Sequence, residues 1–215
     1  MKQLDDFVQL LGLVLIVINA ILFTRSYISN RRNVALLYIF LYLFIGALIM
    51  VISSVLGYLS EDNIYLAHFY FISQFICLSL FYRSLFNAHQ RRVVVVILYL
   101  VLIALGVQYF SDPELIFNFN LFEIFITSFP LVVYSIVHLY NSLSKKGQYM
   151  YLNSGVLIYI TSSTLIFILG NYLHEVLHKD SSIYIWFINK VLYVVYLLLI
   201  LVEWKKLTSL QKNKS

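Results

Sequence analysis

Residues 34–58 read VALLYIFLYLFIGALIMVISSVLGY and contain no charged side chain. A helix rises about 1.5 Å per residue, so a helix over this stretch is long enough to cross the roughly 30 Å hydrocarbon core of a bilayer. An apolar run of about 18 residues or more is typical of a transmembrane helix. Residues 34–58 therefore predict a membrane-spanning helix.

Six further apolar runs repeat this pattern and are separated by short polar breaks. With the first, the predicted spans are 7–24, 34–58, 64–82, 93–110, 115–140, 151–173 and 183–204. The chain of 215 residues is 61% hydrophobic and only 12% charged, with a mean hydropathy of +0.86. That is too little charge for the surface of a soluble protein. We expect an all-α fold, in which residues 1–215 form one domain, an integral membrane bundle of seven transmembrane helices.

The lysines and arginines are unevenly distributed between the two sides of this bundle. Twelve of the 15 fall in alternate loops and the C-terminal tail: Arg25, Arg31, Arg32, Arg83, Arg91, Arg92, Lys145, Lys146, Lys205, Lys206, Lys212 and Lys214. Lys2 and Lys179 fall on the other side, and Lys190 lies inside a predicted span. Basic loops favour the cytoplasmic side. We therefore expect the N-terminus outside and the C-terminus in the cytoplasm.

The charge distribution also bears on location and partners. We expect a multi-pass protein of the inner, cytoplasmic membrane, with the lipid bilayer as a partner. The net charge of +5 is explained by cations that anchor the inner face at anionic lipid. We do not expect a nucleic acid partner.

Glu123 and Lys190 are ionisable residues inside predicted spans. At about 1.5 Å per residue, both lie roughly 10–12 Å from the outer ends of their spans. A charge at that depth is costly unless it faces the protein interior and finds a partner. Their equal depth predicts an ion pair, formed directly or through a ligand. Such a pair is either an internal strut between helices or part of a ligand or ion site.

Polar side chains recur at helical spacing in the outer halves of several spans. Stripes of this kind usually hold helices together, because lipid offers no hydrogen bonds. Here they also predict a small outward-facing polar cavity with an aromatic rim, suited to an unknown small ligand. The candidate ligand-binding residues are Glu123, Lys190, Gln74, Asn120, Asn171, Trp186 and Asn189.

Residues 174–178 read HEVLH, which has the H-E-x-x-H spacing of zinc hydrolases. In that chemistry His174 and His178 bind zinc, Glu175 activates water, and a third ligand is needed, for which His68 is a candidate. The motif lies where the chain leaves the hydrocarbon, and positive side chains at a helix C-terminus complement the helix dipole. We favour a solvated helix end over a metal or proton-sensing site. We assign no catalytic residue and do not expect an enzyme.

Over its whole length the chain resembles uncharacterised bacterial seven-helix membrane proteins rich in Tyr, Phe and Ile, a resemblance that implies no activity. A lysine in the seventh span also resembles the outline of retinal proteins, which implies a Schiff base at Lys190. Trp186 stands four residues before Lys190, where the microbial members have Asp, so Glu123 would have to be the counter-ion. Zinc and retinal are therefore secondary expectations, and our main expectation is a protein without a cofactor.

These features predict a receptor-like or sensory membrane protein. It would bind a small ligand from outside and couple to a cytoplasmic signalling protein through its basic loops. One alternative is a small-solute or proton-coupled transporter with Glu123 as the coupling carboxylate. Another is a membrane zinc hydrolase that uses the HEVLH motif.

Overall fold

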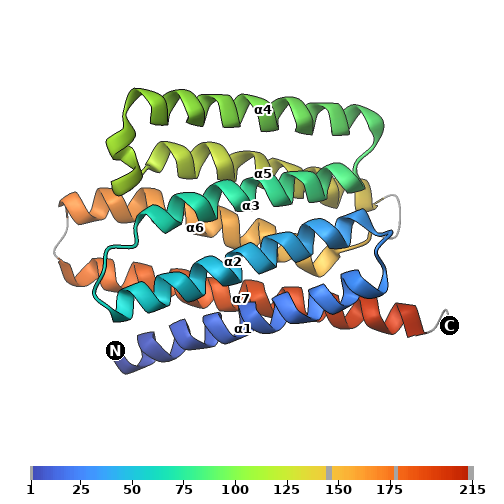
Figure 1. Ribbon diagram of the computed structural model, residues 1–215, viewed down its shortest axis with the longest axis horizontal. Coiled ribbons are helices and arrows are strands. Elements are labelled where there is room, and N and C mark those ends of the chain that lie inside the picture. The colour runs from blue at the N-terminus through green and yellow to red at the C-terminus, as the bar shows by residue number, and fades with distance from the viewer. Residues whose placement is uncertain (1, 144–146, 177–178, 213–215) are drawn as a thin grey trace.

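The computed structural model describes residues 2–143, 147–176 and 179–212, and side chains within them except those of residues 2, 171–176, 179–183 and 210–212. These ranges form the helices α1 (Lys2–Ser29), α2 (Val34–Tyr58), α3 (Tyr65–Leu85), α4 (Ala88–Ser111), α5 (Leu121–Leu143), α6 (Met150–Val176) and α7 (Lys179–Lys212). A short 3-10 helix, η1 (Pro113–Phe117), precedes α5. The long helices lie side by side along the long axis of the molecule (Figure 1).

Seven helices in the described part of the chain are long and apolar enough to cross a membrane. The predicted all-α bundle of seven membrane-spanning helices is therefore confirmed, and the orientation of its termini stays a prediction. The fifth span, expected to begin at residue 115, begins at Leu121. The difference arises because Pro113 starts η1 and Asn118, which follows η1, is extended.

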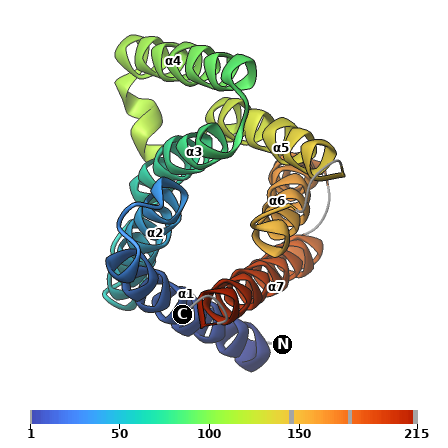
Figure 2. The ribbon, with the colours of Figure 1, turned by 90° about the vertical axis from the view of Figure 1, so that its right-hand side faces the viewer.

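Six of the α-helices form a closed ring in the order α1, α2, α3, α5, α6, α7, and α7 packs again on α1 (Figure 2). Helix α4 lies outside this ring, against α3 and α5. Its buried residues are Val94, Leu98 and Leu105. Apolar side chains such as Leu100 and Ile103 are 61% and 62% exposed, and in a membrane they face lipid.

The directions of the helices divide the ring into two similar halves. Each helix of α1–α2–α3 points in the same direction as the corresponding helix of α5–α6–α7, because α4 carries the chain back across the bundle between the two halves (Figure 1). As a result α3 and α5 are parallel neighbours, and so are α7 and α1. We call these two contacts, α3–α5 and α7–α1, the seams of the ring.

Buried polar side chains join helices inside the ring. Tyr82 of α3 donates a hydrogen bond to Asn153 Oδ1 of α6 at 2.7 Å, and Ser135 of α5 donates to the same oxygen at 3.0 Å. All three side chains are buried. Since apolar burial does not distinguish one helix from another in lipid, such bonds fix α3, α5 and α6 against one another. They lie in the half of the bundle away from the N-terminus and leave the other half for a cavity.

Candidate functional site

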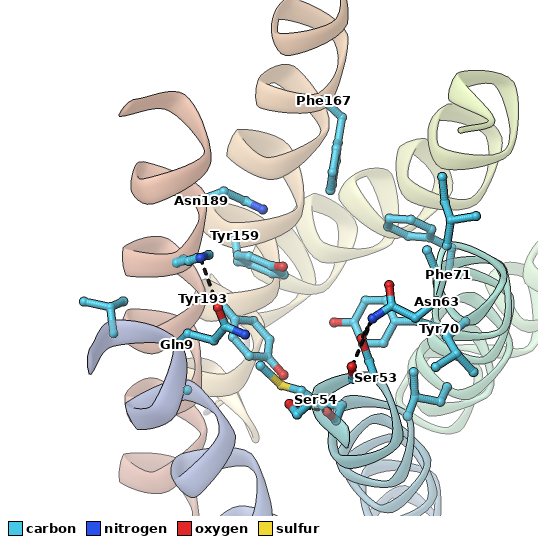
Figure 3. A pocket seen from close by; sticks show the side chains of 18 residues that line it. Gln9, Ser53, Ser54, Asn63, Tyr70, Phe71, Tyr159, Phe167, Asn189 and Tyr193 are labelled. Atoms are coloured by element: carbon cyan, nitrogen blue, oxygen red, sulfur yellow. Dashed lines mark hydrogen bonds between the residues drawn. The ribbon is translucent and has the colours of Figure 1, made fainter. Parts of the chain in front are cut away.

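A cavity of about 620 Å³ opens in the part of the ring near the N-terminus (Figure 3). Side chains from α1, α2, α3, α6 and α7 line it, so both halves of the ring contribute. Its volume falls within the roughly 300–1,000 Å³ that is typical of small-molecule sites. Two of the predicted ligand-binding residues, Asn189 and Lys190, are among its lining residues.

Aromatic rings form much of the cavity wall. Tyr159 of α6 packs against Tyr193 of α7 with ring centroids 5.4 Å apart. On the facing side Phe71 of α3 meets Phe167 of α6 edge to face at 5.7 Å. Tyr70 of α3 completes this wall (Figure 3). Walls of this kind favour a ligand with an apolar or aromatic body.

Lys190 brings a positive charge to the cavity at the α7–α1 seam. Its Nζ donates to Asp5 Oδ2 at 2.7 Å and to Gln9 Oε1 at 3.1 Å, both on α1. An ammonium group has three N–H donors, so one remains after these two bonds. The side chains of Lys190 and Asp5 are 33% and 31% exposed, and Lys190 is among the residues that line the cavity. A ligand with a hydrogen-bond acceptor can therefore engage Lys190.

Two asparagines add polar groups to the cavity. Asn63 lies in the connection between α2 and α3, and its amide donates to the carbonyl and hydroxyl oxygens of Ser53 at 3.0 and 3.1 Å. Asn189 differs, because its Oδ1 is buried and accepts no hydrogen bond from the described residues. A buried acceptor without a donor is unfavourable. That oxygen exposes almost no surface, so a donor on a ligand would reach it only after the Asn189 side chain turns toward the cavity.

A second polar cluster lies at the α3–α5 seam. His68 Nδ1 of α3 lies 2.5 Å from Glu123 Oε2 of α5, and the two residues are 5% and 0% exposed. Tyr109 of α4 donates to the same carboxylate oxygen. Asn120 accepts from the backbone N–H of Glu123 at 3.1 Å and exchanges amide hydrogen bonds with Gln108. Imidazole and carboxylate closed off from water form a site that can hold a proton.

The predicted direct ion pair between Glu123 and Lys190 is wrong. Glu123 pairs with His68 at one seam and Lys190 pairs with Asp5 at the other, on opposite sides of the ring (Figure 2). Each charge does find a partner, as the cost of an unpaired charge in lipid requires. Each pair also joins a base on the last helix of one half to an acid on the first helix of the other.

The remaining predicted ligand residues are not all in one place. Gln74 is buried beside the cavity and donates to the hydroxyl of Tyr70 at 3.2 Å. Trp186 is 38% exposed and packs on Phe167, with ring centroids 5.5 Å apart. The side chain of Asn171 lies outside the described residues. The structure thus divides the predicted cavity into a cavity with Asn189 and Lys190 and a closed cluster with Glu123 and Asn120.

The side chains of the HEVLH motif, with His174, Glu175 and His178, lie outside the described residues, although the backbone of α6 is described as far as Val176. Within the described part of the chain, no group of three or more His, Cys, Asp or Glu side chains could hold a metal ion. His68, the candidate third ligand, is bonded to Glu123.

Glu203 of α7 is a buried charge that sequence reasoning missed. Its exposed fraction is 0%, and its Oε2 accepts from the backbone N–H groups of Tyr151 at 2.8 Å and Leu152 at 3.4 Å. These N–H groups belong to the first turn of α6, where no partner exists within the helix and negative charge is favoured. The next residues, Trp204 and Lys205, are of types that are typical of a membrane surface. Nothing in the sequence therefore indicated that Glu203 is buried.

No family model, curated protein or solved structure matches the chain. The seven apolar helices are consistent with a multi-pass membrane protein. A more specific function has to be inferred from the cavity and from the charges at the seams.

Proposed function

We propose that the protein is a receptor-like membrane protein that binds a small, mainly apolar molecule in the cavity between the two halves of the ring. The observation that carries this proposal is the cavity itself, which is about 620 Å³ in volume and combines aromatic walls with Lys190 and Asn189. Apolar walls with a few polar groups are the usual composition of small-molecule sites.

The polar groups restrict the chemistry of the ligand. Lys190 has one N–H donor beyond its bonds to Asp5 and Gln9, and Asn189 has an acceptor without a donor. The ligand that suits both carries an acceptor and a donor close together, such as an amide, an alcohol or a carboxylic acid. Because Asp5 already balances the charge of Lys190, the ligand needs no full negative charge.

Helix α7 is the element best placed to transmit binding. Lys190 contacts the cavity, and Glu203, on the same helix, holds the first turn of α6. Their separation along the helix is about 20 Å at roughly 1.5 Å per residue. A ligand that changes the Lys190–Asp5 contact would shift α7. Glu203 would pass this shift to the first turn of α6, at the end of the bundle opposite the cavity. That end carries the basic loops that we expect to meet a cytoplasmic signalling partner.

Thermal unfolding of the purified protein with a panel of amides, alcohols and fatty acids tests this proposal. A ligand present at 100 times its Kd stabilises a protein by about 2.7 kcal/mol, which raises the Tm of a chain of this size by roughly 5–10 °C. We expect Asn189→Leu and Lys190→Met to reduce the rise. Lys205→Met, an exposed change on the same helix away from the cavity, should preserve it. An absence of any rise, or a rise unaffected by both cavity variants, would contradict ligand binding there.

A second candidate function is transport of a small solute. It is favoured by the cavity lying between two halves with the same order and directions of helices. Carriers built from parallel repeats place the substrate at the interface between the repeats and move one repeat against the other. The two seams would then be the contacts that rearrange, and the buried Glu123–His68 pair would supply a proton site.

Solute uptake into proteoliposomes distinguishes the two candidates. A transporter should accumulate the ligand found in the thermal screen, and Glu123→Gln should abolish any dependence of uptake on a proton gradient. Glu114→Gln, at an exposed position near the same end of the bundle, is the matched control. Ligand binding without uptake would leave the receptor-like function.

A further inference from the structure

A groove lies at the opposite end of the bundle from the cavity, where α2 and α4 begin and α3 ends. Its volume is about 280 Å³. The lining residues come from these three helices and are Val34, Tyr38, Leu80, Arg83, Ser84 and Arg91. None of its lining residues lines the proposed ligand cavity.

Two arginines from different helices line the groove, and both residues are exposed. Arg83 lies in the last turn of α3, and Arg91 lies in the first turns of α4. The Nε of Arg91 donates to the carbonyl oxygen of Phe86 at 2.7 Å, which orients its planar donor group. The Tyr38 hydroxyl is a third polar group in the lining and donates to no other described residue, whereas the Ser84 hydroxyl donates to a backbone carbonyl. Two arginines and a phenol form a donor set suited to a phosphate group.

The positive charge of the groove is not balanced by the protein. The ion pairs among the described side chains are His68–Glu123 and Lys190–Asp5, so neither groove arginine takes part in one. At this end of the bundle the acidic side chain that the structure describes is Glu203, which is buried and binds the first turn of α6. An anion can therefore bind Arg83 and Arg91 without displacing a carboxylate of the described residues.

The other side of the groove is apolar. Val34 is 49% exposed, and Leu80 also lines the groove. Helix α4 stands outside the ring (Figure 2). The groove that it lines with α2 and α3 therefore lies on the outer side of the ring, which faces lipid in a membrane. A ligand that fits both surfaces has an anionic head and a hydrocarbon tail.

We infer that this groove binds the headgroup of an anionic phospholipid. The phosphate lies between Arg83 and Arg91, with Tyr38 as a further donor, and an acyl chain covers Val34 and Leu80. Juxtamembrane arginines attract anionic lipid in general. The groove adds a defined position, because it brings two arginines and an apolar surface together.

Native mass spectrometry of the detergent-solubilised protein, titrated with phosphatidylglycerol or phosphatidylcholine, tests this site. The test variant is Arg83→Gln/Arg91→Gln, and the control is Arg31→Gln/Arg92→Gln, which removes the same charge from exposed positions outside the groove. We expect phosphatidylglycerol to bind the test variant at least tenfold more weakly than the control, because each charged hydrogen bond that is lost accounts for roughly a factor of ten or more. Phosphatidylcholine should bind weakly to all three proteins.

The single variant Arg83→Gln provides a second test in case the double variant fails to fold, because it preserves the hydrogen bond from Arg91 to Phe86. It should weaken the binding of phosphatidylglycerol by an intermediate amount. Equal binding to the wild type, the groove variants and the control would overturn the site. Displacement of the lipid by millimolar inorganic phosphate would also overturn it, since it would identify a site for soluble phosphate.

Discussion

Removing the carboxylate of Glu123 tests the cluster at the α3–α5 seam. Its Oε2 accepts hydrogen bonds from Tyr109 and from His68, the latter at 2.5 Å. Hydrogen bonds to a charged group contribute about 1.5–3 kcal/mol each, so the two bonds together account for about 3–6 kcal/mol. We therefore expect Glu123→Ala to lower the free energy of unfolding by about 4 kcal/mol.

A double-mutant cycle with His68→Ala separates this interaction from the loss of packing. Because His68 and Glu123 share one hydrogen bond, the double variant should be more stable than the sum of the single effects predicts, by roughly 1.5–3 kcal/mol. The measurement is reversible unfolding in mixed micelles of mild detergent and sodium dodecyl sulfate, followed by helical circular dichroism. Glu114→Ala, at an exposed position, should stay within about 0.5 kcal/mol of the wild type.

Two results would refute the reasoning. If Glu123→Ala changed stability by less than about 1 kcal/mol, the carboxylate would not be paired in the interior. If the single effects simply added, His68 and Glu123 would not interact, and the proton site proposed for a transporter would lose its basis.

Further substitutions test the packing of the ring by the same unfolding assay. Gly155→Ala should destabilise by about 1–3 kcal/mol, because an added Cβ would lie 2.8 Å from Tyr196 Cδ2. Gly106→Ala should instead stabilise by up to about 1 kcal/mol, since nothing lies within 4 Å of an added Cβ on this outer helix. Glu203→Ala should cost about 2–3 kcal/mol and speed amide exchange at Tyr151, whose N–H would lose its acceptor. Unchanged exchange at that amide would show that Glu203 does not hold α6.

The sequence was sufficient to predict the seven helices, because each is a long apolar run with a physical reason to cross a bilayer. It did not predict the ring. Hydropathy does not say which helices are neighbours, since lipid and protein interior are both apolar. One clue was available, however: residues 93–106 of α4 contain almost no polar group, which fits the helix that stands outside.

The depth of a buried charge in the membrane does not identify its partner. Glu123 and Lys190 were placed at similar depths, but the pairing depends on which helices adjoin, and α5 adjoins α3 while α7 adjoins α1. The predicted first span begins at residue 7 and therefore excludes Asp5. Since α1 begins at Lys2, Asp5 lies within the helix and reaches Lys190.

The two seams have a consequence for how the protein is made. Neighbours on either side of a short loop can pair as soon as both have left the ribosome, but Asp5 and Lys190 are 185 residues apart in the chain. Until α7 is synthesised, α1 has no neighbouring helix on that side, and the carboxylate of Asp5 stays unpaired. Closure of the bundle therefore waits for the end of translation, so a chain that stops before α7 would remain an open sheet of helices exposed to membrane quality control.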